Sequence, residues 1–130
     1  MVLKAIAYED RRAKGVIHDL EDLEFVLRNY SALVGEARLF QEAGEVLITD
    51  QILYVDAPAY CLGREIGATY AETVTGALER IAKRLGSPDA EETRGLDRRS
   101  GASGGLAGAN ETAARWRALE LGILQGRRPA

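Results

Sequence analysis

The sequence lacks a second cysteine, a long apolar run and an excess of basic charge. Cys61 is the single cysteine, which excludes a disulfide within the chain, and its apolar neighbours predict a buried thiol rather than a nucleophile. The first apolar run is broken at Lys4, and no later run approaches the roughly 18 residues of a membrane span. We therefore expect a cytoplasmic protein with no signal peptide and no membrane helix.

The length and the net charge of the chain indicate what kind of protein it is. The chain has 130 residues, 46% of them hydrophobic, which is enough to build the core of one small domain. The net charge of −3 gives no strong sign of nucleic-acid binding.

Residues 17–30 are predicted to form an amphipathic helix. Its apolar side is expected to hold Leu20, Leu23, Val26, Leu27 and Tyr30, with Glu21, Glu24 and Arg28 opposite. Asp19 and Asp22 fall along one edge of the apolar stripe. They are interpreted either as an N-cap with a first-turn acid or as part of a site, and the two interpretations are compatible.

A basic face precedes this acidic edge. Lys4, Tyr8 and Arg11 are spaced to share one side of a short helix. Together with Asp19 and Asp22 they would suit the binding of a phosphate group, although such residues more often form weak surface ion pairs.

Several short motifs resemble one enzyme family. The first motif, at residues 3–8 and 10–11, is similar to the pattern LKLxAxxxR. The second, at 18–23 and 25–27, is similar to KDxxDLxxLL, and a third, at 61–66, is similar to an LLGRDI element. This order resembles the C-terminal helical half of AbiEii-like nucleotidyltransferases, minimal polymerase-beta-like enzymes that include many toxins of toxin–antitoxin pairs. The likeness covers about 1–85.

The resemblance implies that a particular set of residues binds a nucleotide. It places Lys4 and either Arg11 or Arg12 at the nucleotide phosphates, and Asp19 and Asp22 in the KDxxD element. His18 stands where the family more often has lysine, so its charge would be only partial near neutral pH. Arg64 would be a second phosphate contact, whereas the residues alone suggest that Arg64 and Glu65 form ordinary surface or interhelical pairs.

One family element has no counterpart. The family binds its metal on a GSxxxxDxD-like element upstream of the lysine motif, and this chain begins just before Lys4. We therefore expect no catalytic and no metal-binding residue here, with magnesium and a nucleoside triphosphate required only if a separate catalytic half is present. Gly86-Ser87, followed by Asp89 and Glu91, is interpreted as a helix end and linker.

The middle of the chain is predicted to form further helices. We expect a loop at 31–35, a short helix at 36–43 ended by Gly44, and an irregular or helical crossing at 45–54. Asp56 is a candidate N-cap for a helix that reaches about Gly67, with Pro58 in its first turn.

The clearest helix is expected before residue 86. Thr69 and Glu72 form a capping box, and Gly86 and Pro88 end the helix. Its apolar stripe consists of Val74, Leu78, Ile81 and Leu85.

The end of the chain divides into a linker and one more helix. Residues 87–110 are rich in glycine and are predicted to be a flexible linker. Asn110 would cap a helix at 111–125, whose stripe of Ala113, Trp116, Leu119 and Ile123 must pack on its own body or on another chain.

The sequence predicts an all-α fold of about five helices. It divides into a helical domain at 1–86, the linker at 87–110 and a C-terminal amphipathic helix at 111–130. The leading hypothesis is a nucleotidyltransferase-like helical region that positions a nucleotide. The alternative is a non-catalytic helical oligomerisation or partner-binding module, and either hypothesis predicts a homo-oligomer or a partner protein.

Overall fold

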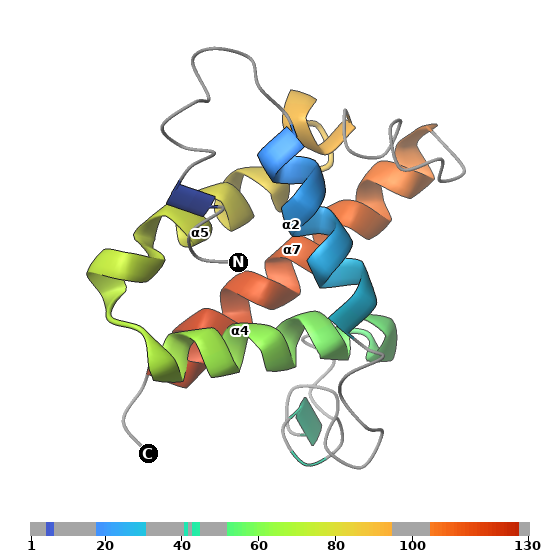
Figure 1. The fold of residues 1–130 in the computed structure, drawn as a ribbon. Coiled ribbons are helices and arrows are strands. Elements are labelled where there is room, and N and C mark those ends of the chain that lie inside the picture. The colour runs from blue at the N-terminus through green and yellow to red at the C-terminus, as the bar shows by residue number, and fades with distance from the viewer. Residues whose placement is uncertain are drawn as a thin grey trace.

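The computed structural model describes the chain at 5–6, 18–30, 41, 43–44, 52–94 and 105–127. In these residues the chain is helical with no strand, which confirms the all-α prediction. The named elements are α2 (His18–Asn29), the 3-10 helix η3 (Tyr54–Asp56), α4 (Ala57–Thr69), α5 (Glu72–Leu85) and α7 (Gly105–Arg127) (Figure 1). None of the described helices has both the length and the apolar character that a bilayer crossing needs.

Helix α2 confirms the amphipathic helix predicted at 17–30, with two differences. Leu23, Leu27 and Tyr30 are buried as expected, but Val26 is exposed. Glu24, expected on the polar side, is only 3% exposed. Glu24 lies three residues before Leu27 and therefore about 60° from it around the helix, which places it inside the buried arc.

The start of α4 agrees with the sequence. Asp56 occupies the N-cap position and proline lies in the first turn, although the Asp56 side chain makes no capping hydrogen bond. Cys61 is buried, as predicted. Glu65 forms an interhelical contact, because the hydroxyl of Tyr30 donates a hydrogen bond to its Oε2 at 2.6 Å.

The predicted capping box at Thr69 is wrong. Thr69 is the last residue of α4, and Ala71 is the N-cap of α5 without a side-chain hydrogen bond. The α4 helix continues through Thr69, so the chain turns only at the extended residue Tyr70. The α5 stripe is confirmed at Leu78, Ile81 and Leu85, whereas Val74 is exposed. Gly86 follows the last residue of α5, as predicted.

Helix α7 begins earlier than predicted. It starts at Gly105, so residues 105–110 are helical rather than linker, and Asn110 lies inside the helix rather than at its N-cap. Residues 91–94 are also helical, while 95–104 lie outside the described residues. An existing helix extends readily because each added residue gains one backbone hydrogen bond. This gain exceeds the cost of placing glycine in the helix. The stripe around Trp116 packs on its own chain, mainly on α4 and then on α5.

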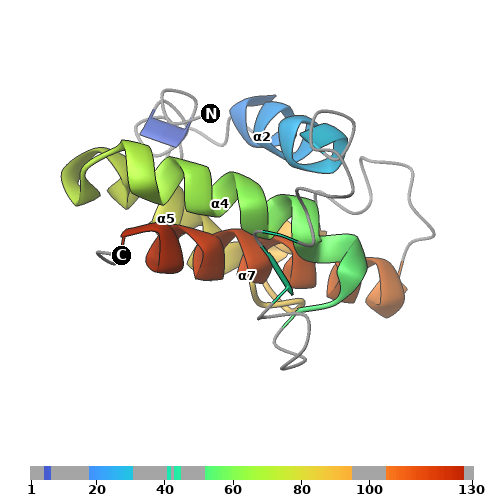
Figure 2. The same cartoon turned by 90° about the horizontal axis from the view of Figure 1, so that it is seen from below.

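Close contact between α4 and α7 organises the fold. The two helices run side by side in the same direction, with α2 over α4 (Figure 2). A Cβ atom at Gly63 would lie 2.3 Å from the carbonyl oxygen of Leu119, and one at Gly122 would lie 2.2 Å from that of Tyr60. Any side chain at these glycines would push the helices apart. The glycines therefore set the interhelical distance on which the rest of the packing depends.

Other predictions fall largely outside the described residues. The loop at 31–35 and most of 36–43 and 45–51 lie there. Gly44, expected to end a helix, is itself helical, since a glycine can continue a helix at a cost of about 1 kcal/mol. Residues 52–53 are irregular and lead into η3, in agreement with the predicted irregular or helical crossing.

Candidate binding groove

The predicted nucleotide-binding residues do not form a described cluster. Lys4 and Arg11 lie outside the described residues, and so does the side chain of Asp19. The backbone of Asp19 lies within α2, so this residue is not the helix N-cap, and Asp22 is exposed. Nucleotide binding therefore stays a prediction that rests on the resemblance. In the described part of the chain, no group of three or more histidine, cysteine or acidic residues could hold a metal ion.

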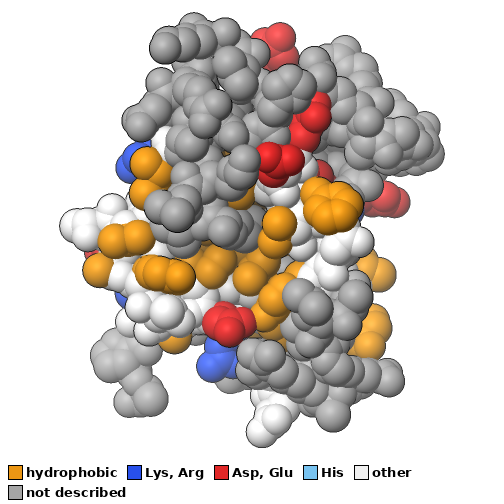
Figure 3. Space-filling view, viewed as in Figure 1, with side chains coloured by type: hydrophobic (Ala, Val, Ile, Leu, Met, Phe, Trp, Pro, Cys, Tyr) orange, Lys and Arg blue, Asp and Glu red, His pale blue; other side chains and the backbone are white. Residues whose placement is uncertain are grey.

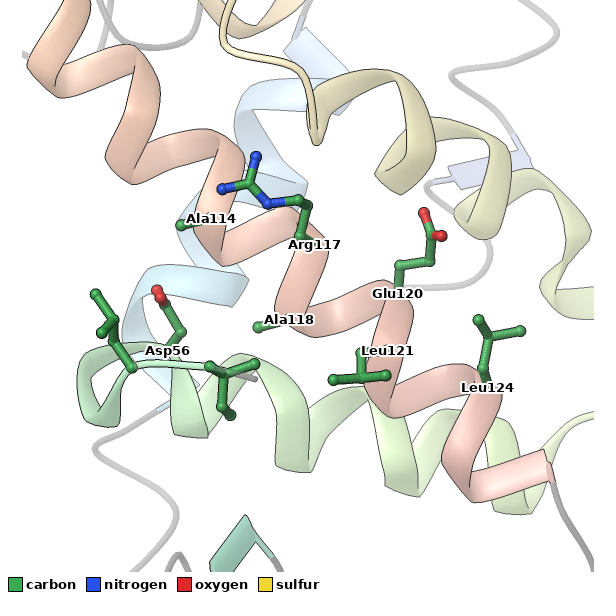
Figure 4. Close-up of a pocket in the computed structure, with 9 residues that line it drawn as sticks. Asp56, Ala114, Arg117, Ala118, Glu120, Leu121 and Leu124 are labelled. Carbon is green, nitrogen blue, oxygen red and sulfur yellow. The ribbon is translucent and has the colours of Figure 1, made fainter. Parts of the chain in front are cut away.

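A groove lies between η3 and the outward side of α7. Its volume is about 450 Å³. Asp56 lies at the η3 end with its carboxyl group directed toward α7, and Leu121 and Leu124 follow farther along α7 (Figure 4). The full lining is Ile52, Leu53, Asp56, Ala114, Arg117, Ala118, Glu120, Leu121 and Leu124. Most of these side chains are apolar, so the groove can bury an apolar ligand surface.

Exposed apolar residues lie in the groove and next to it in the sequence. Leu53 is 67% exposed and Val55 is 76% exposed, and Tyr54 between them is also exposed. Leu124 is exposed on the α7 side of the groove. Leu53 and Leu124 thus expose apolar surface at the groove itself, and exposed apolar side chains at a concave surface are typical of interaction sites.

The face formed by α2 and α4 has a different character. Hydrophobic, acidic and a few basic side chains are mixed on it (Figure 3). Phe25 of α2 is 67% exposed, the same fraction as Leu53, but it does not line the groove. Phe25 therefore offers a matched comparison for the groove residues.

Asp56 is the polar residue at the inner end of the groove. It is placed there because it joins η3 to α4 and packs beneath α7, and only 5% of it is exposed. Within the described part of the chain its carboxylate makes no hydrogen bond, including no helix cap. Burial raises the pKa of Asp56, and repulsion from Glu111 adds to this, while attraction to Arg115 and Arg117 opposes it.

The two arginines near Asp56 bind other groups. Arg115 forms an ion pair with Glu24 through Nη1. Nη1 of Arg117 donates a hydrogen bond to the carbonyl oxygen of Gly86 at 2.7 Å, at the end of α5. The guanidinium group of Arg117 accordingly extends toward the end of α5 (Figure 4). Both arginines act on Asp56 through their charge, and neither donates a hydrogen bond to its carboxylate.

A second carboxylate lines the groove on α7. Burial raises the pKa of Glu120, attraction to the charge of Lys83 lowers this pKa, and repulsion from the charge of Glu79 raises it. Asp56 and Glu120 are thus two acids among the lining residues, against the single base Arg117. The groove is apolar with an acidic excess.

Sequence reasoning did not find this groove. The sequence predicts an irregular or helical crossing at 45–54, but it does not indicate that Ile52 and Leu53 line a groove. Ala114, Ala118 and Leu121 form a second apolar side of α7, opposite the predicted stripe around Trp116. This second side was visible in the sequence as apolar residues at i, i+4 and i+7, and it is the signal that could have indicated a surface for a partner.

Comparisons of the chain with known protein families, curated proteins and solved structures find no match. The geometry of the groove is therefore the feature that indicates a function.

Proposed function

We propose that this chain is a non-catalytic helical module that binds an apolar segment of a partner protein in the groove between η3 and α7. The observation that carries the proposal is the exposure of Leu53 and Leu124, which line a concave and mainly apolar surface. Apolar side chains exposed together at a groove are stabilised when a partner removes them from water.

The shape of the groove favours a segment over a flat protein surface. Small side chains at Ala114 and Ala118 leave room above α7, and η3 forms a wall along one side. A short helix or extended segment can enter such a space and place its apolar side chains against Leu121 and Leu124. This is the common mode in which an amphipathic segment binds a hydrophobic groove.

Selection from a displayed library of random peptides tests the proposal. We expect wild-type protein to enrich peptides with two or more large apolar residues. A variant with Leu53→Asp and Leu124→Asp should bind the enriched peptides at least about tenfold more weakly, because charges on the rim oppose desolvation. Phe25→Asp, at a position as exposed as Leu53 but outside the groove, should bind them as the wild type does.

Two results would contradict the proposal. One is the absence of peptides that discriminate wild type from the double variant, and the other is an equal loss of binding in Phe25→Asp. A second copy of the chain is the competing occupant. In that case the mass measured by light scattering should rise with the concentration of the wild type and not with that of the double variant. This result would assign the groove to self-association and would confirm the predicted homo-oligomer instead.

A further inference from the structure

The carboxylate of Asp56 lacks a partner that a bound segment could supply. Asp56 as a whole residue is only 5% exposed, its carboxyl group borders a groove that is otherwise mainly apolar, and this group makes no hydrogen bond in the described part of the chain. Buried carboxylates normally accept several hydrogen bonds, because desolvation of the charge is otherwise costly. The nearby Arg115 and Arg117 donate to Glu24 and Gly86 instead.

We propose that the segment bound in the groove carries a basic residue among apolar ones, and that its cationic head group donates hydrogen bonds to the Asp56 carboxylate. This inference rests on the proposed function and specifies the chemistry of the partner. The basic side chain would lay its methylene stem along Leu53 and Leu121, since long basic side chains pack their stems on apolar surface while the charged end reaches a polar group.

The charge of the lining supports a basic occupant. Asp56 and Glu120 are both partly desolvated, and the guanidinium group of Arg117 donates its hydrogen bond to Gly86 rather than to either acid. An acidic segment would bring a third carboxylate into this space and would be repelled. A purely apolar segment would remove the remaining water from Asp56 and leave its carboxylate without a hydrogen-bond donor.

The test compares matched peptides on matched variants. Peptides enriched on the wild type, and dependent on Leu53 and Leu124, are resynthesised with each lysine or arginine replaced by norleucine, which keeps an alkyl chain and removes the charge. Affinity is measured by calorimetry on wild type, Asp56→Asn and Glu111→Gln. Glu111 is an exposed acid that acts on Asp56 but does not line the groove, so its variant controls for a general loss of negative charge.

We expect one basic residue whose replacement weakens binding at least about tenfold on the wild type and has little effect on Asp56→Asn. Glu111→Gln should keep most of the affinity and the full preference for the basic peptide. Thermal melts of all three proteins show whether each variant is folded.

The possible failures are distinct. Groove-dependent peptides that bind equally well as norleucine versions, or that bind Asp56→Asn with the same preference, would overturn this inference and leave the proposed function intact. If no groove-dependent peptide is enriched at all, the proposed function and this inference both fall.

Discussion

The indole N–H of Trp116 donates a hydrogen bond to Oε2 of Glu24 at 2.6 Å, joining α7 to α2. Both residues are buried, and Arg115 pairs with the other carboxylate oxygen, Oε1. One carboxylate thus satisfies two donors from neighbouring residues of α7. This contact holds α2 against α7, although the direct packing of α2 is mainly on α4.

Removing this carboxylate should be strongly destabilising. Glu24→Ala leaves the Trp116 N–H without its acceptor and the largely buried Arg115 without its counterion, so we expect a loss of about 3–5 kcal/mol of unfolding free energy in urea titration. Trp116→Phe removes one donor and some apolar contact and should cost less than Glu24→Ala. A double-mutant cycle should give a coupling of about 1 kcal/mol or more between the two positions. Additive effects would show that the hydrogen bond contributes nothing.

The glycine contact between α4 and α7 predicts opposite outcomes at two glycines. Gly122→Ala would place Cβ 2.2 Å from the carbonyl oxygen of Tyr60, so it should cost about 3 kcal/mol or more through displacement of the helices. Gly76→Ala in α5 meets only the flexible end of Arg80 at 3.2 Å. That substitution should stabilise by up to about 1 kcal/mol, because alanine favours helix. Thermal and urea unfolding measure both, and equal effects would contradict the close helix contact.

The raised pKa of Asp56 determines how this residue makes the stability of the protein depend on pH. The folded protein binds this proton more tightly than the unfolded chain does, so Asp56 lowers stability as pH rises from its ordinary pKa of 3.8 through the raised folded value. Asp56→Asn should therefore be more stable than wild type at neutral pH, by about 1 kcal/mol on the scale of one unsatisfied buried polar group.

The gain from Asp56→Asn should vanish near about pH 3, where the wild-type carboxyl is protonated in both folded and unfolded chains. Urea unfolding across the pH range measures the difference. A wild type that is the more stable protein at neutral pH would show that the Asp56 carboxylate is favourably paired.

The nucleotide hypothesis has its own test. We expect the isolated chain to transfer no nucleotide, because transfer requires a divalent ion held by clustered carboxylates at a fixed site. Weak nucleotide binding should be lost in Lys4→Ala and kept in Lys83→Ala, an exposed lysine on α5. Labelled nucleoside triphosphates with magnesium or manganese and candidate acceptors provide the measurement. Labelling abolished by Lys4→Ala or Asp19→Ala would instead identify an active enzyme.

The sequence alone determined the helices and much of their buried sides. The spacing of Leu23, Leu27 and Tyr30, and of Leu78, Ile81 and Leu85, indicated α2 and α5 because a 3.6-residue period needs no knowledge of the partner surface. The end of α5 before Gly86 could also be predicted from the local sequence. Thr69 shows the limit of such signals, since continuation of α4 overrode a plausible capping box.

Only the tertiary structure decided which surfaces met. The burial of Glu24 depends on donors that α7 brings from the far end of the sequence. The glycines of α4 and α7 acquire their role only when the two helices approach closely. The groove likewise exists because η3 and α7 come together and leave Asp56 between them, with no hydrogen bond to its carboxyl group from any described residue. Local spacing fixes which side of a helix is apolar, but the identity of its neighbour depends on packing between distant segments, which no local pattern encodes.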